Sequence, residues 1–229
     1  MLELGGSDPF VVLEDADLEQ AAATAVTSRF MNCGQSCIAA KRFIVLDAVA
    51  DAFTEAFVEK TRNLQPGPPS DSGSTLAPMA RADLRDELAG QVQDAVSKGA
   101  RRLLAGGPAE GEGWYYLPEV LTDVTPDMRA WHEELFGPVA VIYRVSDEAE
   151  ALRLANATTF GLGGSVWTED RGRGEQLARG LTCGCAFVNS LVRSDPRLPF
   201  GGVGDSGYGR ELSLVGIREF VNQKTLWID

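Results

Sequence analysis

The sequence lacks long apolar runs, clusters of basic residues and a leader of basic and then hydrophobic residues. No stretch of its 229 residues is long and apolar enough to cross a bilayer, and acids and glycines stand near the amino terminus. The formal charge of −12, with lysines and arginines scattered, argues against nucleic-acid binding, because phosphate contacts need clustered basic side chains. We therefore expect a cytoplasmic protein whose partners include neither nucleic acid nor membrane.

Histidine is scarce, and the cysteines follow no familiar ligand pattern. His132 is the only histidine, so the sequence alone supports no Ser–His–Asp or Cys–His assignment. Cys33, Cys37, Cys183 and Cys185 match neither a disulfide framework nor the usual zinc-ligand spacing. We predict reduced thiols and no metal site, with Cys183 and Cys185 packed in a buried strand. An oxidative bridge between Cys33 and Cys37 is an alternative that the spacing leaves open.

Strand and helix patterns alternate along the chain, and the length suits one domain or at most two. Apolar residues at helical spacing predict helices, and short apolar runs predict strands. The expected helices start at Asp17 and cover 49–57, 81–98 and 149–155; the expected strands cover 41–46, 139–145, 164–168 and 182–188, with one more beginning at Leu103. This alternation predicts an α/β fold, a mostly parallel sheet flanked by helices, with ligands outside the carboxyl ends of its strands.

The segment Gly202 to Gly207 has the spacing G-x-G-x-x-G of a dinucleotide-binding loop. Such a loop must follow a strand, open a helix and leave room for a second strand. Here Pro199 and Phe200 precede the glycines, and only a short tail follows them. We interpret the segment as a glycine-rich wall rather than a phosphate loop.

Cys37 ends a short polar loop, 32–37, between a predicted helix and a predicted strand. Cysteines are most often small buried apolar residues, but a polar, glycine-containing loop exposes its side chains to ligands. A nucleophilic thiol needs a base to take its proton and later to activate water. Glu3, flanked by two leucines and followed by two glycines that free the backbone, is the candidate base, because burial would raise its pKa toward neutrality.

Four motifs follow one another along the chain: Leu2-Glu3-Leu4-Gly5-Gly6, Gly34-Gln35-Ser36-Cys37, Glu134-Leu135-Phe136-Gly137-Pro138, and Pro199-Phe200-Gly201-Gly202 with Ser206-Gly207-Tyr208-Gly209-Arg210-Glu211. Their order and spacing resemble those of the aldehyde dehydrogenase superfamily, over essentially the whole chain. The resemblance is to the carboxyl-terminal, catalytic half of such an enzyme. It implies that the amino-terminal half, which supplies most of the dinucleotide-binding domain in that family, is absent here.

The resemblance implies oxidation of an aldehyde to a carboxylic acid, with NAD or NADP as the cofactor. It makes Cys37 the nucleophile that forms a thioester and Glu3 the base that activates water to release the acid. It also implies that Glu134 contacts the ribose next to nicotinamide and that Phe136 positions the ring. Without the motifs, Glu134 would be interpreted as a solvated acid and Phe136 as a core residue. Asn189 is a weaker candidate for the substrate region.

Within the superfamily, the segments 5–10 and 194–200 are most similar to the succinate-semialdehyde dehydrogenase branch. That similarity implies a small aldehyde with a carboxylate as substrate, and Ser194 as a residue that meets this carboxylate. Two positions depart from the pattern. Met31 stands where some members of the branch have arginine, and Gly204 stands where the wider family usually has lysine.

The expected organisation is an α/β catalytic domain over 1–219 and an oligomerisation strand over 220–229. The apolar tail would be an unprotected edge unless paired, which predicts a homo-oligomer. A separate amino-terminal dinucleotide-binding chain is a second expected partner. Two alternatives stay open: a noncatalytic truncated remnant that serves as an oligomerisation or interaction module, and a thioesterase or esterase that uses the thiol alone.

Overall fold

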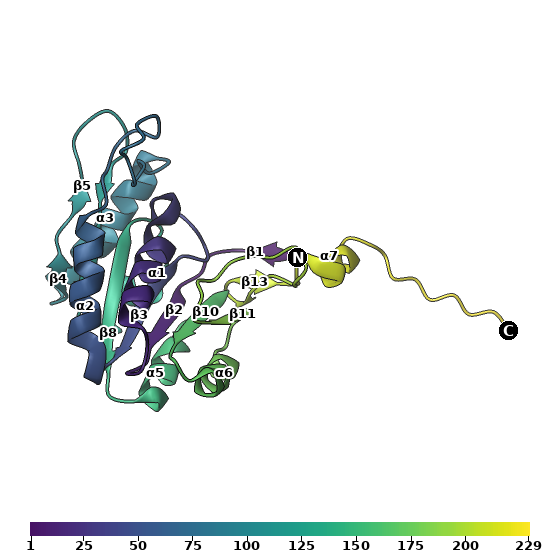
Figure 1. Cartoon of the computed structure of the whole chain (residues 1–229). Helices are drawn as coiled ribbons and strands as arrows, with labels where there is room; N and C mark the ends of the chain where they lie inside the picture. The colour runs from purple at the N-terminus through teal and green to yellow at the C-terminus, as the bar shows by residue number, and fades with distance from the viewer.

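A seven-stranded sheet forms the centre of the molecule (Figure 1), and the computed structural model describes all 229 residues. The strand order is β11-β10-β2-β3-β8-β7-β4, and every neighbouring pair is parallel except β7 and β4. The mostly parallel α/β sheet that the sequence predicts is confirmed. The strands are β2 (Asp8–Val12), β3 (Ala40–Leu46), β4 (Arg101–Leu104), β7 (Glu119–Thr122), β8 (Val139–Val145), β10 (Gly163–Trp167) and β11 (Cys185–Val188).

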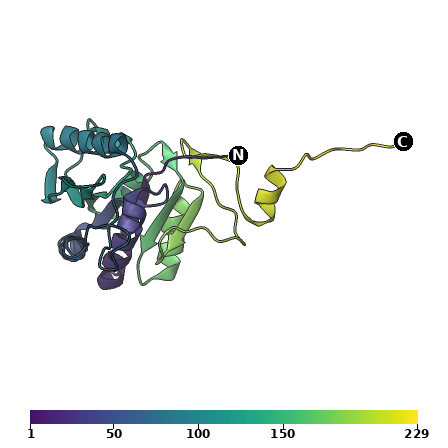
Figure 2. The same cartoon turned by 90° about the horizontal axis from the view of Figure 1, so that it is seen from above.

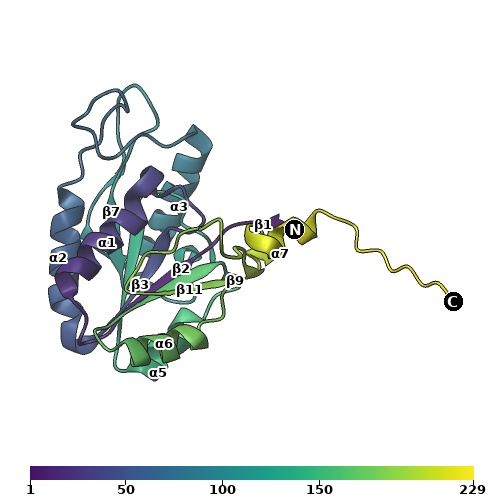
Figure 3. The same ribbon diagram turned by 45° about the vertical axis from the view of Figure 1, so that its right-hand side comes forward.

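Helices cover both faces of this sheet (Figure 3). The helices α1 (Leu18–Phe30) and α2 (Asp47–Arg62) pack together on one face, and α5 (Glu148–Ala155) and α6 (Arg171–Gly180) pack on the other. This arrangement follows from the right-handed connections that parallel strands prefer, because the chain moves one way along the sheet through α1 and the other way through α5. The remaining helices are η1 (Met31–Gly34), α3 (Ala82–Ser97), α4 (Arg129–His132) and α7 (Ser213–Glu219).

Local signals explain where the helices of the first face lie. The side chain of Asp17 accepts a hydrogen bond from the Gln20 N–H at 3.0 Å, which caps the start of α1 as the sequence predicts. In α2, Phe53 and Phe57 are four residues apart and fully buried against the sheet. The Phe57 ring lies 4.7 Å from that of Phe43 on β3, and burying each such side chain contributes about 2–3 kcal/mol.

Both edges of the sheet differ from the sequence-based expectation. Leu103 and Leu104 end β4 rather than begin a strand, because two exposed arginines, Arg101 and Arg102, open it. β11 begins only at Cys185, and its residues are half-buried or exposed rather than buried. The physical reason is the same for both: each strand has a neighbour on one side only, and an edge strand carries polar and partly exposed residues.

An arm of short strands projects from the sheet, and in it the start of the chain pairs with a segment that precedes α7 (Figure 1). Strand β1 (Leu2–Glu3) pairs with β13 (Gly207–Tyr208), and β12 (Val203–Gly204) pairs with β9 (Phe160–Gly161); a further pair, β5 (Gly107–Pro108) with β6 (Tyr116–Leu117), lies at the other end of the molecule. The segment 202–207 therefore contributes two short strands and opens no helix, as the sequence analysis infers.

The tail beyond α7 extends away from the rest of the chain (Figure 2). Residues 223–228 form no strand within the single chain, and Phe220, Trp227 and Ile228 are exposed. A strand formed by 220–229 on a second copy stays a prediction. No helix of the chain is both long enough and apolar enough to span a membrane.

Candidate active site

One open hollow of about 550 Å³ brings together most of the residues that the sequence singles out. Cys37, Glu3, Glu134 and Phe136 all line it, although they come from three distant segments of the chain. Ser194 does not: it lies in the exposed loop after β11, outside this lining. The full lining is Glu3, Leu4, Gly5, Gln35, Ser36, Cys37, Glu134 and Phe136.

The hollow lies at the amino ends of the central strands, not at their carboxyl ends. Its residues directly precede β2, β3 and β8. The expectation of ligands outside the carboxyl ends therefore does not describe this site. At the carboxyl ends of β2 and β10 the chain's own polar groups bond one another: Thr168 Oγ1 donates to the Asp15 carboxylate at 2.7 Å, and the Asn189 side chain bonds both the N–H and the C=O of Thr168.

That pairing also corrects the interpretation of Asn189 as a candidate for the substrate region. Its side-chain amide is committed to Thr168, at 3.0 Å from the Thr168 N and 2.7 Å from the Thr168 O. Asn189 itself has a φ of 51°, in the left-handed region that asparagine tolerates better than most residues. The Asn189 side chain thus joins the end of β11 to Thr168, the residue that follows β10.

A sharp turn after α1 delivers the Cys37 loop to the hollow. Asn32, Cys33 and Gly34 have φ values of 54°, 56° and 70°, three consecutive residues in the left-handed region. A Cβ on Gly34 would lie 2.4 Å from the Gly137 carbonyl oxygen, so only glycine fits there. The Asn32 side chain donates to the Gln35 carbonyl at 2.8 Å and braces the turn. Backbone strain of this kind persists only where surrounding contacts fix it.

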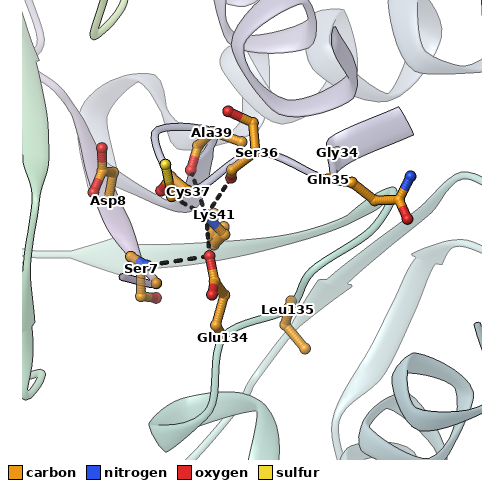
Figure 4. A network of polar contacts seen from close by, with 12 residues as sticks. Ser7, Asp8, Gly34, Gln35, Ser36, Cys37, Ala39, Lys41, Glu134 and Leu135 are labelled. Carbon is orange, nitrogen blue, oxygen red and sulfur yellow. Dashed lines mark hydrogen bonds and ion pairs between the residues drawn. The ribbon is translucent and has the colours of Figure 1, made fainter. Parts of the chain in front are cut away.

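Lys41, at the start of β3, is the main residue of the site that the sequence analysis overlooked. Its side chain is 1% exposed, and its Nζ donates to the backbone carbonyls of Ser36 and Cys37 at 3.0 Å each (Figure 4). It also lies 3.1 Å from Glu134 Oε1. Lys41 and Arg42 at the start of the buried strand Ala40–Leu46 were the available signal, because a buried charge needs a partner.

Glu134 is held by two donors on one of its oxygens. Oε1 accepts from the Gly6 N–H at 3.1 Å as well as contacting Lys41, while Oε2 has no hydrogen-bond partner within the chain. A Cβ on Gly5 would lie 2.3 Å from Oε2, and one on Gly6 would lie 2.5 Å from the Cys37 carbonyl oxygen. The paired glycines therefore allow close approach of these groups. The backbone freedom expected of this pair from the sequence is not used, because neither glycine has a positive φ.

Arg29, on the last turn of α1, joins the two segments behind the hollow. Its guanidinium is fully buried and donates to the carbonyls of Gly34 at 3.2 Å and Leu135 at 2.9 Å, and also to Gly137 and Ala40. Burial lowers the pKa of Arg29, and the Glu134 charge opposes that effect. The arginine thus fixes the Cys37 loop against the segment that carries Glu134 and Phe136.

Several groups set the acidity of the Cys37 thiol. Burial raises its pKa, and the carboxylates of Glu134 and Asp8 raise it further. The charge of Lys41 and a hydrogen bond from the Ile38 N–H lower it. The thiol is therefore mainly protonated at neutral pH in the chain alone, and a base is needed to take its proton.

Glu3 lies on the arm and meets the hollow from the opposite side. Burial raises the pKa of Glu3, the Glu211 charge raises it further, and Arg210 lowers it. Its Oε1 is buried without a hydrogen-bond partner. A carboxylate with a raised pKa is a stronger base than an ordinary glutamate, as the sequence analysis expects of Glu3.

The other cysteines and the histidine do not line this hollow. Cys33 is buried, faces a separate hollow beside Phe30 and Leu64, and has its pKa raised to about 11 by burial. All four cysteines are free. His132 ends α4, and its ring nitrogen lies 2.5 Å from the Pro126 carbonyl oxygen.

Comparison with protein families matches residues 1–226 to the aldehyde dehydrogenase family. The chain belongs to that family, and the resemblance carried by the four motifs is confirmed. It is 52% identical over 228 residues to a succinate-semialdehyde dehydrogenase [NADP(+)] of Mycolicibacterium paratuberculosis, covering all of this chain and 48% of the relative. It is also 52% identical to the succinate semialdehyde dehydrogenase [NAD(P)+] Sad of Escherichia coli, over all of this chain and 50% of that protein.

Solved structures give the same picture of the fold. Succinic semialdehyde dehydrogenase from Streptococcus pyogenes, in complex with NADP+, superimposes with a TM-score of 0.94 at 39% identity, over 99% of this chain and 50% of that one. Betaine aldehyde dehydrogenase from Staphylococcus aureus, in complex with NAD+, gives 0.91 at 30% identity, over 95% of this chain and 44% of that one. The chain thus spans about half the length of the curated relatives it matches.

Proposed function

We propose that this chain is the catalytic half of an NAD(P)-dependent aldehyde dehydrogenase and that succinate semialdehyde is its substrate. The observation that carries the proposal is the hollow that Cys37, Glu3 and Glu134 line together, although they come from separate segments. The relatives at about half identity, which are named succinate-semialdehyde dehydrogenases, support the substrate. Ser194, on the exposed loop after β11, stays the proposed contact for the substrate carboxylate.

Cys37 and Glu3 divide the covalent chemistry between them. The Cys37 sulfur adds to the aldehyde carbon, its proton passes to Glu3 or to solvent, and the Cys37 N–H is a donor for the oxygen that becomes negative. Loss of a hydride from that carbon leaves a thioester. Glu3 then takes a proton from water as the water adds to the thioester carbon, so that the acid leaves and the Cys37 thiol is restored.

Glu134 and Phe136, which line the hollow together with Cys37, fit a nicotinamide dinucleotide. Glu134 Oε2 has no partner within the chain and is free to accept from a ribose hydroxyl, and Phe136 offers an apolar surface in the same hollow. The bound nicotinamide supplies the acceptor for the hydride. Lys41 and Gly6 hold the Glu134 carboxylate from behind through Oε1, which leaves Oε2 toward the hollow.

The apolar surface of α7 and the tail supports a homo-oligomer. Leu214, Ile217, Phe220 and Trp227 are all exposed in the single chain, and exposed large apolar side chains concentrated in one segment are typical of an interface. We propose that residues 220–229 form a strand on a second copy. Size-exclusion chromatography with light scattering should show an assembly for the whole chain and a smaller species when 220–229 are deleted.

The activity is tested by complementation, because the chain spans half the length of its relatives. The chain is mixed with a separately produced amino-terminal half of the Escherichia coli relative, and reduction of NADP or NAD is followed with succinate semialdehyde. We expect aldehyde-dependent reduction that falls by a factor of about a thousand or more with Cys37→Ala. Two halves that co-elute and show no such reduction would contradict the proposal, and ester hydrolysis that depends on Cys37 without reduction would favour an esterase.

A further inference from the structure

Lys41 has an unusual number of acceptors around one buried ammonium group. Its Nζ lies 3.0 Å from the carbonyl oxygens of Ser36 and Cys37, 3.1 Å from that of Ala39 and 3.1 Å from Glu134 Oε1 (Figure 4). Three of these acceptors belong to the loop that carries the thiol, and the fourth belongs to the segment before β8. The Lys41 side chain therefore links the loop before β3, which carries Cys37, to the segment before β8, which carries Glu134.

The surroundings of Lys41 act on its charge in both directions: burial lowers the pKa of Lys41, whereas the charge of Glu134 and its hydrogen bond raise it. The number of acceptors favours the charged form. An ammonium group has three N–H donors and a neutral amine has two, so four acceptors at hydrogen-bond distance are served best by the protonated form. At 1% exposure no solvent replaces a missing donor. The Glu134 carboxylate supplies the opposite charge that a buried ammonium group needs.

The neighbouring buried cations are placed differently. Arg29 and Arg42 are also buried, but their donors go to backbone carbonyls: Arg42, for example, donates to Ser7, Leu154 and Ala155 at 2.8 Å each. Of the three cations, only Lys41 contacts both the thiol loop and a carboxylate of the hollow. This pair of contacts is thus specific to Lys41, and Arg29 and Arg42 do not make it.

We propose that Lys41 is a positioning residue for both halves of the proposed reaction, fixing the Cys37 loop and Glu134 relative to each other and holding a positive charge beside the thiol. The proposal rests on the proposed function, in which Cys37 is the nucleophile and Glu134 meets the cofactor. Lys41 acts through these two residues and touches neither substrate nor cofactor.

The charges around the thiol give the proposal a signed consequence. Glu134, before β8, and Asp8, on β2, both raise the pKa of Cys37, and Lys41 lowers it. Glu3, on β1, lines the same hollow, while Arg29 lies behind the loop. Removing the lysine leaves the thiol among carboxylates, whereas neutralising Glu134 leaves the lysine uncompensated. The two changes must therefore move the thiol titration in opposite directions.

The experiment measures the rate of Cys37 alkylation by iodoacetamide against pH on the 229-residue chain, with the modified residue identified by mass spectrometry. With Lys41→Met, we expect the midpoint of the rate profile to rise by about one pH unit, so that alkylation below the midpoint slows about tenfold. With Glu134→Gln, we expect the midpoint to fall. Lys60→Met and Glu59→Gln are the matched controls, because Lys60 pairs with Glu19, Glu59 is exposed on α2, and neither residue lines the hollow.

Midpoints that stay unchanged in both variants, or that move in the same direction, would overturn the proposal. If Lys41→Met does not fold, Glu134→Gln and Lys41→Arg still decide the question: the arginine variant should keep the midpoint within about half a unit, because it keeps the charge. The measurement needs neither aldehyde nor cofactor. Failure of dehydrogenase activity in the complementation experiment is therefore distinguishable from failure of this inference.

Discussion

The two walls of the hollow are built on different principles. Behind Cys37 and Glu134, buried Lys41 and Arg29 bind backbone carbonyls from both segments, so that wall is fixed by many internal contacts. Glu3 lies on a two-residue strand of the arm, paired only with β13, and its carboxylate has no hydrogen bond. Leu2 and Leu4 beside it are 44% and 49% exposed.

The difference separates two ways of placing a reactive group. On the buried wall, polar contacts decide geometry and fold stability together, because each cation satisfies carbonyls that would otherwise be buried without donors. On the arm, the carboxylate is placed by a short strand pair, and its side chain contributes little to the fold. We therefore expect substitutions on the arm to lower the rate of the reaction without lowering the free energy of unfolding. Substitutions behind the other wall should lower the free energy of unfolding.

The largest expected effect is on the arm. Glu3→Gln should lower steady-state aldehyde oxidation in the complementation assay by a factor of about 100 to 1,000, because no base then activates water. The denaturation midpoint of the chain should not fall below that of the parent, since the carboxylate has no partner to lose and its raised pKa means that the folded chain does not favour its charge. Because the pKa of Glu3 is raised and the base must be ionised, parent turnover should decline as pH falls through that raised pKa.

The exposed acid Glu59 on α2 provides the control, and Glu59→Gln should behave as the parent in both measurements. A Glu3→Gln chain that loses stability along with activity would break the comparison, because the arm would then contribute to the fold. Retention of full turnover would instead remove Glu3 from the mechanism.

The next effect is on the buried wall. Arg29→Met should lower the free energy of unfolding by about 3 kcal/mol or more, because carbonyls of Gly34 and Leu135 lose their donor in a site closed to solvent. Urea denaturation of the two chains measures the difference. Arg101→Met removes an exposed arginine that pairs only with Asp123, and should leave the curve unchanged. Equal losses for Arg29 and Arg101 would show that the buried contacts are not special.

The smallest effect concerns Asp8, which lies on β2 behind the same wall. Burial raises its pKa to about 6, and its Oδ2 has no partner. A raised pKa means that the folded chain favours the protonated acid. The stabilisation is therefore complete below the ordinary pKa near 3.8 and is lost as pH rises through about 6.

Asp8→Asn should accordingly match the parent near pH 4 and exceed it in free energy of unfolding by about 1–3 kcal/mol at pH 8. Urea curves at a series of pH values measure this, with the exposed loop residue Asp71 replaced by asparagine as the control. A difference between Asp8→Asn and the parent that is independent of pH would mean that Asp8 does not ionise in this range.

Much of the fold was predictable because its signals are local. The helix after Asp17 has its cap, α2 has its apolar stripe, and β8 begins with the run Val139–Tyr143, which corresponds to a strand buried on both faces. The edge strands of the sheet were not predictable in this way, because whether a strand has one neighbour or two depends on residues far away in the chain. The strands expected from Leu103 and over 182–188 are present, but the start of each and the burial of the second differ from the prediction for that reason.

The candidate site divides in the same way. The motifs identified Cys37, Glu3, Glu134 and Phe136 together, since motif order reflects a shared fold rather than any one contact. Lys41 was missed because its importance comes from a carboxylate 93 positions further along the chain, and Ser194 lies outside the hollow because its loop leaves the sheet at the opposite edge from β4.

By itself, the sequence determined the family of this protein, its alternation of helices and strands, and the reactive groups that it carries. Tertiary structure alone decided that the reactive groups meet at the amino ends of the strands, and that a lysine joins two of their segments. The physical reason is one of range. Periodicity, caps and turn residues act between near neighbours, whereas burial and charge pairing act between segments that become neighbours only when the sheet is complete.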